Sequence, residues 1–265
     1  MSVSYYRNRT NNQLIIYNLP LTTGFSGIRS NFPATIQNKG VEFELNTINV
    51  QKKDFKWSSS VNLSIPNNKL VSFPGIEAST YADLYIVGES IYIRKLYATT
   101  GVDAATGVYT FKDYNGDGKI TSPDDNKRSL LIGQKFYGGF NNSFSYKNWN
   151  FDIFLQFVKQ TGYNDLYGSS AASYPGVFAN QPRYILDDNR WQQHGDKSSI
   201  QPYTTEYNAA ARSASFLYQV SDAGIGDASF LRLKNVSLSY QLPSKWAKGS
   251  NCRAYLQAQN LYVYC

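Results

Sequence analysis

The sequence predicts an all-β protein, an antiparallel up-and-down sheet of about eight strands that is an open, curved segment of a transmembrane β-barrel. Three observations support this fold class. Apolar and polar residues alternate with a period of two, which marks strands with two unlike faces. Short and long connections alternate between these strands. Aromatic residues, including 22 tyrosines, make up 15% of the chain, whereas charged residues make up only 17%.

The alternation is clearest in residues 55–65 and 149–157, where aromatic and aliphatic residues take most of the odd positions and Ser, Asn, Asp and Gln take most of the even ones. In residues 230–242 the parity shifts near Lys234 and Asn235, where we expect a β-bulge. No convincing amphipathic helix is expected. The eight predicted strands are residues 3–9, 14–19, 41–45, 55–65, 140–146, 149–157, 230–242 and 253–261.

The connections predict where the membrane lies. Short turns are expected at residues 10–13, 51–54, 147–148 and 243–251, and long loops at residues 20–39, 66–135 and 159–229. In an up-and-down sheet this alternation puts every short turn at one end and every long loop at the other, as in outer-membrane barrels. Such strands need about 9–11 residues to cross the bilayer. We therefore expect an outer-membrane location, with 66–135 and 159–229 as extracellular loop regions and the odd positions of 149–157 against outer-membrane lipid.

Other classes of protein receive less support. A soluble sandwich shows the same alternation, so a soluble, secreted, calcium-bearing β-rich glycan-binding module stays open as the alternative. The net charge of +7 comes from scattered Lys and Arg, which gives no basis for nucleic-acid binding. His194 is the only histidine and lies in a polar stretch, so we expect no catalytic residues and no enzyme.

One loop has the spacing of a calcium site. Residues 113–124 read DYNGDGKITSPD, with oxygen side chains at positions one, three, five and twelve and Gly118 at position six. This is the pattern of an EF-hand-type loop, except that an Asp takes the place of the usual Glu at position twelve. A turn without metal is the alternative. The predicted structural calcium ligands are Asp113, Asn115, Asp117, Lys119 (through its carbonyl) and Asp124.

Aromatic residues gather in the long loops. They could stack on the faces of sugar rings, although packing within the loops is the simpler role for any one of them. The residues concerned are Tyr81, Tyr85, Tyr163, Tyr167, Tyr174, Tyr184, Trp191 and Tyr203.

Several motifs in order resemble one known family. They are residues 5–10 (YYRNRT), 19–24 (LPLTTG), 38–45 (NKGVEFEL), 101–107 followed by the loop 113–125, 227–236 (DASFLRLKNV) and 259–261 (QNL). Together they resemble the C-terminal part of the SusC/RagA family of TonB-dependent outer-membrane transporters. The resemblance runs through nearly the whole chain but includes neither the plug of such transporters nor their earlier strands, so we expect a fragment of a barrel.

The resemblance implies a function for the whole transporter. It implies uptake of oligosaccharides or peptides across a Bacteroidetes-type outer membrane. It also implies two partners, a SusD-type surface lipoprotein that caps the barrel and a TonB complex that supplies energy through the N-terminal part. The residues themselves do not specify the transported substrate.

Overall fold

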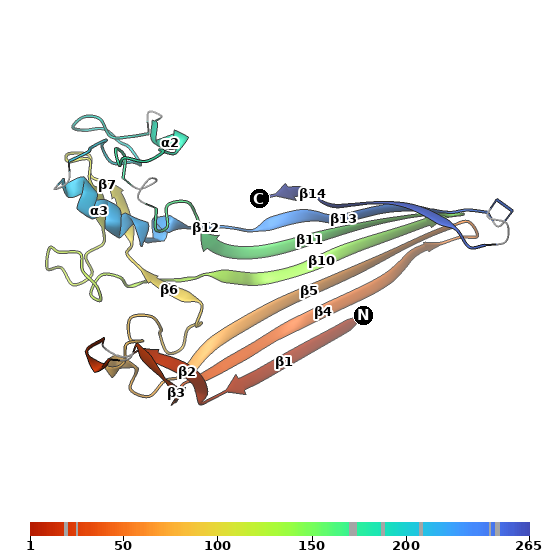
Figure 1. The fold of residues 1–265 in the computed structure, drawn as a ribbon, viewed down its shortest axis with the longest axis horizontal. Coiled ribbons are helices and arrows are strands. Elements are labelled where there is room, and N and C mark those ends of the chain that lie inside the picture. The colour runs from red at the N-terminus through yellow and green to blue at the C-terminus, as the bar shows by residue number, and fades with distance from the viewer. Residues whose placement is uncertain are drawn as a thin grey trace.

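The computed structural model describes residues 1–18, 21–24, 26–169, 174–186, 189–206, 209–243, 245–246 and 250–265. Long antiparallel strands run side by side in one curved sheet, and the loops gather at one end of it (Figure 1). The order across the sheet is β1-β4-β5-β10-β11-β13-β14, and β12 pairs with β11. The bounds are β1 (Ser2–Thr10), β4 (Thr35–Gln51), β5 (Phe55–Ser72), β10 (Gly133–Tyr146), β11 (Trp149–Tyr163), β12 (Ile225–Asp227), β13 (Phe230–Gln241) and β14 (Arg253–Tyr264).

The predicted antiparallel sheet of eight strands is confirmed, but one member differs. The chain after β1 forms β2 (Gln13–Asn18), which pairs with β3 (Gly27–Phe32) in a separate hairpin, and β1 pairs directly with β4. The prediction that residues 14–19 form a strand of the wall is therefore wrong, and Leu19 lies outside the described residues. The eighth strand of the sheet is the short β12. Alternation could not distinguish these cases, because a hairpin within a loop also has two faces.

The pairs β4 and β5, β10 and β11, and β13 and β14 are each connected at the same end of the sheet, which we call the turn end (Figure 1). Between β4 and β5, the Lys52 N–H donates to the Phe55 carbonyl at 2.8 Å. Between β10 and β11 the two turn residues are Lys147 and Asn148, and Lys147 has a left-handed φ of 51°. The predicted short connection at residues 10–13 is present between β1 and β2, but its expected place at the turn end is wrong, since Thr10 pairs with Ile36 at the opposite end, the loop end.

The register sorts the side chains onto an apolar face and a polar face. Residues of like character are opposite one another, as where Trp57 and Phe144 pair and stack with ring centroids 5.7 Å apart. Many apolar-face residues are accessible, from 36% for Phe151 to 74% for Leu256. In water such exposure would forfeit about 25 cal/mol per Å² of apolar surface, whereas hydrocarbon imposes no such cost. The exposed apolar face therefore favours a lipid surround.

The two faces are defined by their residues. The apolar face carries Val3, Tyr5, Val41, Phe43, Leu45, Phe55, Trp57, Val61, Leu63, Ile65, Phe140, Phe144, Trp149, Phe151, Ile153, Leu155, Phe157, Val236, Leu238 and Leu256. The polar face carries Ser58, Ser60, Asn62, Asn141, Ser143, Asn150, Asp152, Gln156, Ser237 and Ser239.

The predicted bulge in β13 is confirmed. Opposite β11, the register passes from Asn235 to Leu233, so Lys234 is the extra residue. Strand β5 continues through Pro66, which pairs with Gly40, and reaches Ser72 within the stretch expected as loop. Pro66 removes one backbone donor, yet strand pairing resumes with Asn67 opposite Lys39.

The loop end has cores of its own. A buried cluster of Ala34, Leu70, Phe73 and Ile76 packs segment 73–91 against the ends of β4 and β5. Helix α3 (Ala210–Gln219) was not expected, because its apolar positions include the small residues Ala211 and Ala214, which are buried. No described helix is long and apolar enough to span a membrane. The shorter elements are η1 (Leu21–Thr23), η2 (Ile76–Ala78), β6 (Ile93–Leu96) paired with β9 (Arg128–Leu131), β7 (Thr99–Val102) paired with β8 (Tyr109–Phe111), α2 (Arg183–Leu186) and η3 (Asp222–Gly224).

A charge placed on the apolar face should destabilise the wall. In the full-length protein, Ile153→Arg should cost about 2–4 kcal/mol near the bilayer midplane, because a guanidinium would meet hydrocarbon. Gln156→Arg on the polar face of the same strand is the matched control. The fraction of heat-modifiable folded barrel on gels measures both. Equal tolerance of the two substitutions would contradict the assignment of the apolar face to lipid.

Candidate functional site

The polar face of the sheet presents hydroxyls, amides and one central carboxylate. Asp152 of β11 accepts hydrogen bonds from the hydroxyls of Ser143 on β10 and Ser237 on β13. On the same face, the Ser145 hydroxyl donates to Asn150 at 2.7 Å. Side chains of this size and polarity suit a surface in contact with water. They can also donate to or accept from a polar solute that passes along the face.

Aromatic rings lie flat against this face where glycines leave room. The Tyr6 ring covers Gly40 directly opposite it, and a Cβ on Gly40 would be 2.6 Å from the Tyr6 hydroxyl. The Phe154 ring covers Gly139 in the same way, at 2.5 Å. Distances below 3.0 Å leave no space for a Cβ, so these glycines permit the rings to lie along the wall. The rings offer flat apolar surfaces among the hydroxyls.

At the loop end, two long excursions of the chain are joined through Asp222. Its Oδ1 accepts from the backbone N–H of Thr99 at 2.9 Å and from the Thr99 hydroxyl at 2.7 Å. Its Oδ2 lies 3.7 Å from Nε of Arg128. Its own N–H donates to the Tyr97 carbonyl at 2.9 Å. Residues from segment 73–132 thus meet the segment that follows β11, and we call these contacts the Asp222 clasp.

Aromatic packing strengthens the same junction. Tyr109 is buried and stacks on Tyr218 of α3 with ring centroids 3.8 Å apart. Burial, and then the neighbouring Tyr218, raises the pKa of the Tyr109 phenol, so it stays protonated. Trp191 covers Gly107, and its indole donates to the Ala104 carbonyl at 3.0 Å. The two excursions therefore form one folded unit above the sheet, which we call the loop unit.

The predicted calcium loop folds back on itself through its own oxygens. The two carboxylate oxygens of Asp113 accept from the N–H of Gly116 at 2.6 Å and of Gly118 at 2.8 Å. Asn115 accepts from the Asp117 N–H at 3.2 Å, and Asp117 accepts from the Lys119 N–H at 2.8 Å. Carbonyl and carboxylate oxygens in one tight turn are the chemistry that calcium prefers.

The loop is closed by Asp125 rather than by its neighbour. Asp125 is fully buried and accepts from the N–H of Tyr114 at 2.7 Å and of Thr121 at 2.9 Å, whereas Asp124 is exposed. These backbone donors, Thr121 first, hold the pKa of Asp125 below its ordinary value. Within the described part of the chain, no three His, Cys, Asp or Glu side chains gather in a way that could hold a metal ion. The calcium ligands, Asp124 included, stay a prediction.

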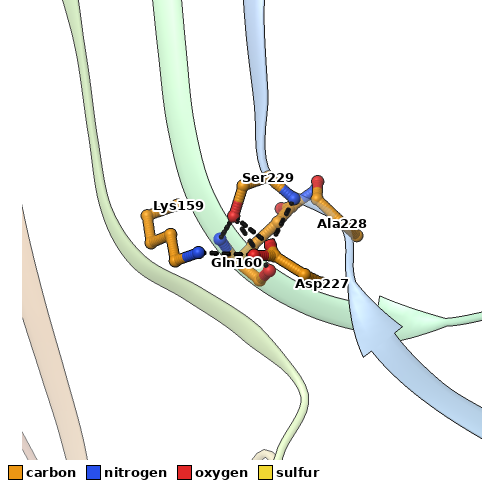
Figure 2. A network of polar contacts seen from close by, with 5 residues as sticks. All are labelled: Lys159, Gln160, Asp227, Ala228 and Ser229. Atoms are coloured by element: carbon orange, nitrogen blue, oxygen red, sulfur yellow. Dashed lines mark hydrogen bonds and ion pairs between the residues drawn. The ribbon is translucent and has the colours of Figure 1, made fainter. Parts of the chain in front are cut away.

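A second polar network fixes the point where β11 and β13 meet the loop end (Figure 2). The Lys159 ammonium lies 2.5 Å from Asp227, and the Ser229 N–H and hydroxyl both donate to the same carboxylate. The Gln160 N–H donates to the Ser229 hydroxyl at 3.1 Å, and its amide donates to the Ala228 carbonyl at 3.0 Å. The network joins β11 to the junction of β12 and β13. It gives Asp227 and Ser229, from the motif at residues 227–236, a structural role.

Most of the loop aromatics singled out in the sequence serve packing. Tyr81 and Tyr85 stack beside the cluster at the end of β5, Tyr163 and Tyr167 lie with ring centroids 4.0 Å apart, and Tyr174 is buried. Tyr184 donates to Asp165. Tyr203 is 51% exposed and lies under the Arg190 guanidinium. His194 is exposed.

Comparisons with known proteins agree with this architecture. No protein-family model matches the chain. The chain is 27% identical over 294 residues to the TonB-dependent receptor P26 of Formosa agariphila, covering 99% of this chain and 28% of that receptor. It is 25% identical over 280 residues to the TonB-dependent receptor SusC of Bacteroides thetaiotaomicron, covering 97% of this chain and 26% of SusC. The solved structure of the RagAB peptide transporter matches with a TM-score of 0.77 at 21% identity, covering 99% of this chain and 29% of that chain.

The chain spans less than a third of the length of these relatives. Over that span the fold of the chain agrees with that of the solved RagAB structure. The location is the cell outer membrane. The resemblance that the motifs indicated is confirmed: over nearly its whole length the chain is similar to TonB-dependent receptors that include SusC, and its fold matches that of the corresponding part of RagAB.

Proposed function

We propose that the chain forms part of the wall and of the outer loops of an outer-membrane importer for oligosaccharides or peptides. The two-faced sheet is the observation that carries this proposal. Its apolar face meets lipid, and its polar face, with Ser58, Ser60, Asn62 and Asp152, borders a wide aqueous path. SusC is a TonB-dependent receptor and RagAB is a peptide transporter. Both support uptake of a nutrient rather than catalysis.

Two partners follow from the same proposal. A TonB complex would supply energy through the N-terminal part of the receptor, and a SusD-type lipoprotein would cap the loop end. The loop unit supports the second partner, because the Asp222 clasp gives the outer end a folded surface instead of separate loops. The site residues serve binding and structure in this proposal, and no described residue is assigned to chemistry.

The alternative, a soluble calcium-bearing glycan-binding module, is disfavoured by the apolar face. Val3, Val41 and Ile65 lie on neighbouring strands with 60%, 40% and 46% of their surface exposed. A soluble sandwich would bury such a face against a second sheet. The long strands of the described chain instead share a single sheet.

Uptake by cells tests the proposed function. Deleting the gene of the full-length receptor should abolish uptake of at least one labelled oligosaccharide or peptide, and the intact gene should restore it. Uptake should also require TonB. A receptor without transport activity would leave the uptake of every substrate unchanged, and uptake that continues without TonB would contradict the proposed energy source.

Calcium is part of the proposal as a structural ion in the loop of residues 113–124. With Asp at position twelve, affinity should fall in the weak extracellular range, about 10⁻⁴–10⁻³ M. Calorimetry on the full-length receptor should show heat of binding that Asp117→Ala removes. Asp124→Ala should weaken binding, whereas Asp125→Asn should destabilise the loop with or without calcium. Equal heats for the wild type and Asp117→Ala would rule out this site.

The chain on its own should not form a channel. Outer-membrane transporters close about 22 strands, and a barrel of eight strands has an interior filled by side chains. The small residues of the polar face would fill a narrow barrel poorly, and open edges in lipid leave N–H and C=O groups unpaired. Single-channel recording of the purified chain in a planar bilayer should show no steps. Reproducible steps from the monomeric chain would mean that it closes by itself.

A further inference from the structure

The apolar face ends abruptly on β1, β4 and β5, and positive charge follows it toward the loop end. Two apolar rows cross these strands, Val3 with Phe43 and Leu63, then Tyr5 with Val41 and Ile65. The next two rows on the same face are Arg7 with Lys39 and Asn67, then Arg9 with Gln37 and Lys69. We call Arg7, Arg9, Lys39 and Lys69 the basic rim.

Hydrogen bonds show that the two arginines share one side of the sheet. The Nε atoms of Arg7 and Arg9 donate to the same Gln37 oxygen, at 2.7 and 2.9 Å. Gln37 is itself buried, with 7% of its surface exposed. The shared acceptor holds both guanidinium groups beside each other at the border of the apolar face. A guanidinium has five donors in all, and these bonds use one from each.

Among the residues that the structure describes, no carboxylate forms an ion pair with the four charges of the basic rim. Across the described residues, the ion pairs within 4.0 Å are Lys159 with Asp227 and Arg128 with Asp222. On β11, Lys159 follows the apolar residue Phe157 at the loop-end border of the apolar face. Its charge is offset there by Asp227. Arg7 and Lys39 are directly opposite each other, and like charges so placed are destabilising. An anion at this position would relieve that repulsion.

The surroundings leave room for such an anion. A hollow of about 430 Å³ is bordered by Lys39, Lys69, Asn67 and Ser90, and by the apolar Leu131. One carboxylate, Glu89, also borders the hollow and accepts from the Ser129 hydroxyl. Glu42 and Glu44 belong to the opposite face, because they alternate with Val41 and Phe43 along β4.

We propose that the basic rim binds the phosphate-bearing headgroup of a lipid in the outer leaflet, whose acyl chains lie along the adjacent apolar rows. Basic residues next to a membrane-embedded surface attract anionic headgroups, at about 1 kcal/mol per Lys or Arg. The apolar rows favour a lipid over a free anion, since only a lipid fills both surfaces. The inference rests on the outer-membrane location and loop-out orientation, and it does not depend on import.

Lipid binding to the full-length receptor tests the proposal. The probes are lipid A with its phosphates and dephosphorylated lipid A, each titrated in detergent micelles and followed by native mass spectrometry. Lys39→Gln with Lys69→Gln should weaken binding of the phosphorylated lipid about thirtyfold, from two lost charges. The same change at Lys52 and Lys53, in the turn at the other end of β4 and β5, removes equal charge and should have less than about a twofold effect.

A charge-conserving variant, a check of folding and a salt titration serve as controls. Lys39→Arg with Lys69→Arg should bind like the wild type, and heat-modifiability should confirm that each variant is folded. Added salt should weaken binding of the phosphorylated lipid to the wild type and leave binding of the dephosphorylated lipid unaffected. Equal affinity for the two lipids, or equal losses at both ends of the strands, would overturn the proposal. Inorganic phosphate should displace the bound lipid no more than sodium chloride of equal ionic strength does. If phosphate displaces more, the rim is a site for free anions and the lipid assignment is overturned. Since no transported substrate is added, failure here leaves the import proposal standing.

Discussion

The backbone register of the sheet is the constraint on which both faces depend. A slip of one residue between two strands would move every side chain to the other face, so that Ser58 would lie beside Phe144 and Trp57 beside Ser145. The two-residue turn at Lys147 and Asn148 prevents such a slip between β10 and β11. The bulge at Lys234 shifts the parity of β13, which keeps both Leu233 and Val236 on the apolar face.

The same register places polar groups among the apolar residues of this face, and near its middle Asn142 and Ser59 are partners of each other. Asn142 lies in the row between Phe140 and Phe144, with 8% of its surface exposed. Its Oδ1 accepts from the Trp57 indole at 2.9 Å and from the Ser59 hydroxyl at 2.7 Å. Hydrocarbon offers no hydrogen bonds, so polar groups there must be satisfied within the protein. The Trp57 indole is therefore directed to a protein partner, and the network links β5 to β10 without exposing a bare donor.

The sequence was sufficient for features that repeat along a strand and insufficient for contacts between distant segments. Period-two alternation located the wall strands, the Lys147 turn and the bulge near Lys234, because each depends on neighbours in the chain. It failed at residues 14–19, where a loop hairpin has the same pattern. The Asp222 clasp could not be predicted, since Asp222 and Thr99 are 123 residues apart. Asp125 was missed because it follows the twelve-residue motif by one position, and it differs from Asp124 in burial and in its hydrogen bonds to Tyr114 and Thr121, which depend on the folded loop.

Sheet order explains why these particular excursions meet. Segment 73–132 precedes β10 and the second excursion follows β11, and β10 and β11 are the two arms of one tight hairpin. Their loop-end termini are neighbours, with Gly133 opposite Thr161, so the first excursion ends beside the start of the second. The Asp222 clasp connects the two excursions a second time, beyond the hairpin formed by β10 and β11. A displacement of either excursion must break the hydrogen bonds of Asp222 or carry the other excursion with it. The Asp222 clasp therefore couples the two excursions above the hairpin of β10 and β11.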